Sequence, residues 1–102
     1  MKIVWTEPAI RDLQSIREYI GKDSEYYATR FVEKILSSVG NLSEFPLMGR
    51  KVPEAEESTI REIIFQNYRI MYQHKENVIL ILTIIHGSMS IETMSVKPWN
   101  IL

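Results

Sequence analysis

The longest apolar run of the chain, Val78 to Ile85, is interrupted only by Thr83 and constrains the fold more than any other segment. It is far too short to cross a membrane as a helix, which takes about 20 apolar residues. A short run that is apolar at nearly every position suits a strand covered on both faces. We therefore expect a central β-strand over residues 78–86.

Two shorter segments before this strand have a similar composition. Residues 60–65 and 68–74 are rich in β-branched and aromatic side chains, and links of only two or three residues, 66–67 and 75–77, separate the three segments. Links this short join antiparallel neighbours, so the sequence predicts a three-stranded meander. Alternation along the middle strand puts Tyr68, Ile70 and Tyr72 on one face and Arg69, Met71 and Gln73 on the other.

The first half of the chain has the periodicity of amphipathic helices. After a β-branched run at residues 2–5, Thr6-Glu7-Pro8 is a helix-start signal, and Gly21 ends the first predicted helix. Ser24 is the cap of a second helix that ends before Pro46. The apolar positions are Ile10, Leu13, Ile16 and Ile20, then Ala28, Phe31, Val32, Ile35, Leu36, Val39 and Leu42. The two helices, joined by three residues, form a predicted hairpin.

This order of elements predicts one α+β domain over residues 1–102, with the N-terminal strand and the helix hairpin packed on a largely antiparallel sheet. Residues 88–97 are expected to form a short C-terminal helix or an extended tail. Because two helices can cover only one face of the sheet, we expect the other face to need a cover, which a partner protein would supply.

Composition excludes several kinds of site. The chain has no cysteine, two histidines 12 positions apart and four scattered glycines, so we expect no metal, no cofactor and no phosphate loop. The formal net charge of -1 argues against a general nucleic-acid binder. The N-terminus has no long apolar segment, so we expect a cytoplasmic protein without membrane contact.

Six polar residues are the candidates for direct function: Arg50 in a Pro-Gly loop, Arg61 and Arg69 on adjacent strands, Tyr68 and Tyr72, and His86 at a strand end. An arginine fork can grip phosphate, and an imidazole can move a proton near neutral pH. Structural roles are the alternative. Arg61 could form an edge ion pair with Glu62, Arg69 could be a satisfied cross-strand residue, and His86 could cap its strand.

Five short motifs follow one another along nearly the whole chain: Pro46-Leu47-Met48-Gly49-Arg50 with Val52-Pro53-Glu54, Ile60-Arg61-Glu62, Asn67-Tyr68-Arg69-Ile70-Met71-Tyr72, Ile84-Ile85-His86-Gly87, and a closing Lys97-Pro98-Trp99. In this order they resemble the RelE/ParE toxin superfamily, and more closely its ParE-like, plasmid-stabilisation branch. The resemblance implies a β-α-α-β-β-β fold. It also implies the toxin component of a type II toxin–antitoxin system, held in a hetero-oligomer by a cognate ParD-like or RelB-like antitoxin.

The two branches imply different actions. RelE-like members are ribosome-dependent mRNA endoribonucleases that use a strand arginine, lysines on the preceding strand, and an Arg and a Tyr after the last Gly. Arg69 matches the strand arginine, but Glu62 and Ile64 stand near the lysine positions and Ser88 follows Gly87. Under this alternative only Arg69 and His86 are left as catalytic residues.

These departures favour the ParE-like action, in which the toxin binds and poisons DNA gyrase without catalysis of its own. Its expected target-binding residues are Arg50, Arg61, Arg69 and Tyr72. A third alternative is a non-toxic protein of the same fold that only binds its antitoxin. In each case the antitoxin is expected to wrap an apolar surface, with contacts at Ile35, Val39, Leu80, Leu82 and Trp99.

Overall fold

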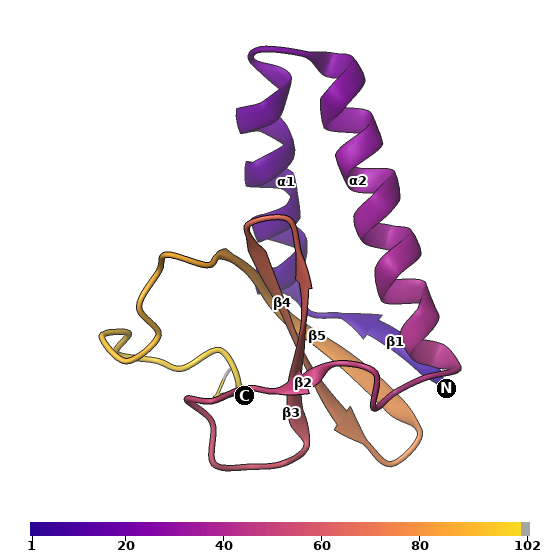
Figure 1. Cartoon of the computed structure of the whole chain (residues 1–102), viewed down its shortest axis with the longest axis vertical. Coiled ribbons are helices and arrows are strands. Elements are labelled where there is room, and N and C mark those ends of the chain that lie inside the picture. Colours follow the sequence, from indigo (N-terminus) through magenta and orange to yellow (C-terminus); the bar gives the residue numbers. More distant parts are fainter. Residues whose placement is uncertain (101–102) are drawn as a thin grey trace.

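The computed structural model describes residues 1–100 as two helices packed on a five-stranded sheet (Figure 1). The elements are β1 (Lys2–Trp5), α1 (Glu7–Gly21), α2 (Glu25–Gly40), a 3₁₀ turn (Asn41–Ser43), β2 (Arg50–Lys51), β3 (Ile60–Phe65), β4 (Tyr68–Lys75) and β5 (Val78–His86). The α+β class, the helix hairpin and the three-stranded meander are therefore confirmed. The two-residue strand β2 was not predicted.

Both helices begin where the sequence places a hydroxyl cap. The Thr6 side chain accepts a hydrogen bond from the backbone N–H of Ala9 and also donates one to the carbonyl of Ile81 at 2.6 Å. The Ser24 side chain accepts from the backbone N–H of Tyr27. Because Thr6 bonds to both α1 and β5, the cap also fixes where the helix meets the sheet.

The strands lie in the order β1-β5-β4-β3-β2. β1 runs parallel to β5, and all other neighbours are antiparallel. β5 is thus internal to the sheet, as its apolar run predicts. The pairing of Met71 with Thr83 and of Tyr72 with Ile81 leaves Leu82 as an extra residue, and this bulge changes the face on which later residues of β5 lie.

One core lies between the hairpin and the sheet. Its buried residues come from both helices, from the 3₁₀ turn, and from β4 and β5: Ala9, Phe31, Ile35, Val39, Leu42, Ile70, Tyr72, Ile79, Ile81 and Ile84. Ile70 and Tyr72 share this face and Met71 lies on the other, so the predicted alternation of β4 is confirmed. The tip of the hairpin extends beyond the sheet (Figure 1).

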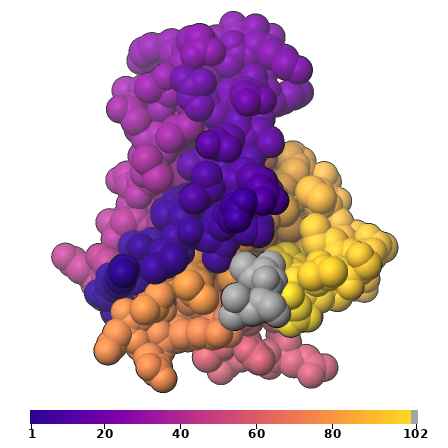
Figure 2. Space-filling model, turned by 180° about the vertical axis from the view of Figure 1, so that it is seen from behind, coloured from indigo at the N-terminus to yellow at the C-terminus, as the bar shows by residue number. Residues whose placement is uncertain are grey.

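The second face of the sheet has its own apolar cluster, made of Val52, Ile60, Met71, Leu82, Ile85 and Ile91, with Ala55, Leu80, Met94 and Trp99 packed against it. Val52 and Ala55 come from the loop before β3, whereas Ile91, Met94 and Trp99 come from the segment after β5. Figure 2 shows this C-terminal segment lying beside the strands. The chain therefore covers much of this face itself, and a partner is left only the part around Leu80 and Trp99.

The C-terminal segment, residues 87–100, forms turns and bends without a helix or a strand. Of the two predicted forms, the tail is the one observed, up to residue 100. The ammonium group of Lys97 holds it in shape by donating to the carbonyls of Ile91, Glu92 and Met94 at 2.9–3.1 Å. A segment without regular secondary structure thus supplies the side chains that complete the second core.

Candidate functional site

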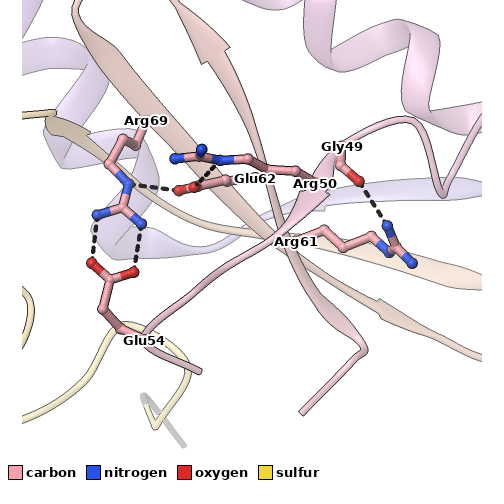
Figure 3. A network of polar contacts seen from close by, with 6 residues as sticks. All are labelled: Gly49, Arg50, Glu54, Arg61, Glu62 and Arg69. Carbon is pink, nitrogen blue, oxygen red and sulfur yellow. Dashed lines mark hydrogen bonds and ion pairs between the residues drawn. The ribbon is translucent and has the colours of Figure 1, made fainter. Parts of the chain in front are cut away.

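Four charged side chains form one connected cluster on the second face of the sheet (Figure 3). Arg69 donates from Nη1 and Nη2 to the two carboxylate oxygens of Glu54, at 2.9 and 2.8 Å, and from Nε to Glu62 at 2.6 Å. The other oxygen of Glu62 accepts from Arg50 Nε at 2.7 Å. Two positive and two negative charges therefore meet in a cluster that is neutral as a whole.

The hairpin register explains why Glu62 and Arg69 meet. The two-residue turn at 66–67 pairs Phe65 with Tyr68, so Glu62 stands opposite Met71 and diagonal to Arg69, on the same face. Arg50 reaches Glu62 because β2 pairs these two residues directly. Glu54 comes instead from the irregular loop between β2 and β3, and the loop places its carboxylate over the arginine fork.

Burial makes this cluster more than a surface ion pair. The side chain of Glu62 is 0% exposed and that of Arg69 is 9% exposed, compared with 22% for Glu54 and 60% for Arg50. The hydrogen bonds from Arg69 lower the pKa of the Glu54 carboxyl below its usual value. The bond to Glu54 is the largest cause of a raised Arg69 pKa, the bond to Glu62 adds to it, and burial opposes both. All three nitrogen groups of the Arg69 guanidinium are therefore committed to internal carboxylates.

Arg61 and Tyr72 lie apart from this cluster. Arg61 Nη1 donates to the carbonyl of Gly49 at 2.8 Å, on the side away from Glu62 (Figure 3), so the ion pair of Arg61 with Glu62 is not formed. Consecutive residues of a strand point to opposite faces, which is the physical reason. The Tyr72 hydroxyl is also used internally, because it donates to the carbonyl of Pro46 and accepts from Gly49 N–H. Burial raises the pKa of this phenol.

His86 and Arg69 point to opposite faces of the sheet. His86 pairs with Tyr68, whose ring packs on Phe31 of the hairpin, whereas Arg69 pairs with Ile85 of the second core. Both residues border an open cleft of about 350 Å³ at the strand ends, together with Arg50 and Glu54. The cleft thus has the two candidate catalytic residues on different walls.

The imidazole of His86 is also engaged. Its Nδ1 accepts from the backbone N–H of Ser88 at 3.2 Å and lies 2.7 Å from the Ser88 hydroxyl. Nδ1 of the ring is therefore already occupied by the chain.

The five expected antitoxin contacts fall into two groups. Ile35, Val39 and Leu82 are buried in the two cores, so in this conformation they offer a partner no surface. Leu80 and Trp99 are only partly buried, at the margin of the second core. An exposed apolar surface lies elsewhere, at Phe45, Pro46, Leu47 and Met48 after the hairpin.

Sequence reasoning missed the role of Glu54 and of Glu62 as partners of Arg69. A signal for Glu62 was present, since a two-residue turn after Phe65 puts residues 62 and 69 on one face. Nothing in the local sequence indicates how the acidic loop folds back, so Glu54 could not be assigned. Within residues 1–100 no group of His, Asp or Glu side chains could hold a metal ion, and no helix is long and apolar enough to span a membrane.

A hairpin on a mixed five-stranded sheet, with a strand arginine in its charged cluster, defines a toxin of the RelE/ParE superfamily. Within it the chain belongs to the family described as the ParE toxin of the type II toxin–antitoxin system, parDE, whose model matches residues 3–91. Membership makes this chain the toxin component of such a pair, and so a protein with an antitoxin partner.

Individual relatives agree with this family. The chain is 32% identical over 88 residues to "Toxin RelE2" of Caulobacter vibrioides, and the aligned region covers 85% of this chain and 96% of that protein. It is 39% identical to "Putative toxin Y4kP" of Sinorhizobium fredii, over 84% of this chain and 88% of that one. A chain of the solved structure "Chromosomal ParDE TA system from P. aeruginosa" superposes with a TM-score of 0.70 at 25% identity, covering 84% of this chain and 95% of that chain.

Proposed function

We propose that this toxin acts by binding DNA gyrase, and that a ParD-like antitoxin neutralises it. One observation carries the choice of a binding mode over RNA cleavage: the fork of Arg69, the strand arginine of the RelE-like motif, is filled by Glu54 and Glu62. Glu54 thus occupies the two-bond face of the fork that would hold a scissile phosphate, and the two carboxylates neutralise the charge of Arg69.

The chemistry of RNA cleavage supports the same choice. Attack by a 2′-hydroxyl needs a base, an acid and cationic stabilisation of the crowded phosphate. Here the buried cation is neutralised, and His86 lies on the opposite face with Nδ1 occupied by Ser88. A cluster that is neutral as a whole and held by internal ion pairs is better suited to holding a surface in shape than to catalysis.

The exposed surface offers what a protein-binding toxin needs. Phe45, Leu47 and Met48 are each about half exposed or more, and Arg50 stands near them with most of its side chain in solvent. Apolar residues with an arginine at their margin are typical of the centre of a protein interface. We infer that this surface contacts the target, and that Leu80 and Trp99 are among the antitoxin contacts.

Expression of the chain without its antitoxin tests the proposal. Growth arrest with a DNA damage response and inhibition of purified gyrase in a supercoiling assay are the expected results. Arg50→Gln should weaken the inhibition, and Lys51→Gln is the matched control because it removes the same charge from the next, also exposed, residue. Equal effects of the two variants would remove Arg50 from the target surface.

The relative named RelE2 favours a second candidate, a RelE-like ribonuclease. Loss of translation with intact DNA, and cleavage of mRNA on ribosomes, would replace the gyrase proposal by this one. Unimpaired growth, together with binding of the neighbouring gene's product, would instead identify a toxin-fold protein that only binds its antitoxin. A cytoplasmic location accords with each of the three and stays a prediction.

A further inference from the structure

We propose that Glu54 determines what the Arg69 fork binds: its carboxylate occupies a latent site for a phosphate oxyanion and keeps that site closed. Arg69 and Glu54 form two parallel N–H···O bonds at 2.9 and 2.8 Å. An arginine fork binds a phosphate through the same two-bond geometry. Glu54 is thus an internal substitute for an external anion. The inference draws on the same cluster as the proposed function but needs no gyrase.

Of the two carboxylates on Arg69, only Glu54 is placed to leave. Glu62 projects from β3, is 0% exposed and is held by two arginines. Glu54 is 22% exposed and sits on the irregular loop between β2 and β3, bonded to Arg69 alone among the residues that the structure describes. If this carboxylate withdraws, Nη1 and Nη2 of Arg69 become free while Nε stays on Glu62.

The surroundings fit an oxyanion. The cleft of about 350 Å³ is lined by Glu54, Arg69 and Arg50, so the pair that Glu54 forms with the fork borders a space open to solvent. Within residues 1–100, Arg50 uses only its Nε for hydrogen bonding, which leaves its two terminal nitrogens for a ligand. With Glu54 charged, the cluster has two arginines and two carboxylates and a net charge of zero. Without the Glu54 charge, only Glu62 balances the two arginines, and the net charge is +1.

The test is phosphate binding by the full chain with Glu54→Gln. Glutamine keeps the size of the side chain and removes its charge, and the pairs of Glu62 with both arginines are unaffected. Binding of inorganic phosphate, followed by calorimetry at constant ionic strength, should become about tenfold tighter or more than in the wild type. Glu56→Gln removes the same charge from an exposed position of the same loop, and should change nothing.

Two further variants keep the test decisive. Glu54→Ala removes the charge of the side chain and also shortens it, so that it no longer contacts Arg69, and should show the same gain in phosphate affinity. Glu54→Lys is not used because it would add a positive charge of its own. Adding Arg69→Lys to Glu54→Gln keeps the charge but removes the planar fork, so the gain should be lost. A short single-stranded RNA, titrated in parallel, shows whether the site takes free phosphate or the phosphate of a nucleic acid.

A gain that depends on Arg69, in either titration, supports the inference. No gain in either titration, or a gain that survives Arg69→Lys or that Glu56→Gln reproduces, overturns it. Neither result bears on gyrase inhibition by the wild type, so the two proposals stand or fall separately.

Discussion

Glu62 is the residue on which the charged cluster depends, because its carboxylate is fully buried and joins two arginines. A buried carboxylate is stable only while it is paired and hydrogen-bonded. Arg50 is mostly exposed, so Arg69 supplies the pairing that is shielded from water. At the scale of single residues, then, Arg69 is the partner whose loss the protein should tolerate least.

Arg69→Gln should therefore lower the free energy of unfolding by about 3–5 kcal/mol, the usual cost of leaving a buried charge without its partner. Urea unfolding at neutral pH measures the change. Arg30→Gln, on the exposed surface of α2, is the control and should stay within about 0.5 kcal/mol. A small effect of Arg69→Gln would mean that the network contributes little to stability.

The lowered pKa of Glu54 predicts a dependence of stability on pH. A carboxyl whose pKa is lower in the folded state stabilises the fold at pH values above its unfolded pKa, close to 4.5, and loses that contribution as the pH falls through the folded value. The difference in unfolding free energy between the wild type and Glu54→Gln should thus shrink as the pH falls from 7 to below 4.5. A difference that stays constant would show that the Glu54 charge does not stabilise the fold.

At the scale of elements, the connection from α2 to β2 has little freedom. Gly49 lies against the backbone carbonyl of Glu62 and the ring of Tyr72, and its N–H donates to the Tyr72 hydroxyl. A Cβ at this position would stand 2.6 Å from that carbonyl oxygen and 2.8 Å from the tyrosine. The glycine is required because two neighbouring strands approach it closely.

Gly49→Ala should accordingly lower the free energy of unfolding by about 1–3 kcal/mol, since backbone or the buried tyrosine must move. Gly40→Ala, at the end of α2, meets no atom within 4 Å and should be neutral or stabilising by up to about 1 kcal/mol. Thermal and urea unfolding of the pair give the comparison. Equal behaviour of the two variants would contradict the close approach at Gly49.

At the scale of the whole molecule, the sheet separates two cores, and the C-terminal segment closes the second. Ile91 is 1% exposed although its backbone is in neither a helix nor a strand. Trp99 and Met94 pack beside it. The segment after β5 is therefore part of the folded structure, and an antitoxin that binds here meets a face already partly covered.

Ile91→Ala should cost about 2–5 kcal/mol of unfolding free energy, as expected for a buried side chain truncated in a packed core. Val96→Ala in the same segment is the control, because Val96 is 63% exposed and should change stability by less than about 0.5 kcal/mol. Unfolding curves with a dye that reports exposed apolar surface would detect the opened face. If both variants behaved like the wild type, the segment would not be a fixed cover.

The sequence by itself determined the two helices and the longer strands of this protein, and the class to which it belongs. Caps at Thr6 and Ser24, the helical periodicity and the apolar run of β5 are local signals, and local interactions decide them. Only the tertiary structure decided that Glu54 fills the Arg69 fork, that residues after 87 cover the second face, and that Ile35, Val39 and Leu82 are inaccessible. These outcomes depend on contacts between segments far apart in the chain, and no periodicity records which loop folds back onto which face.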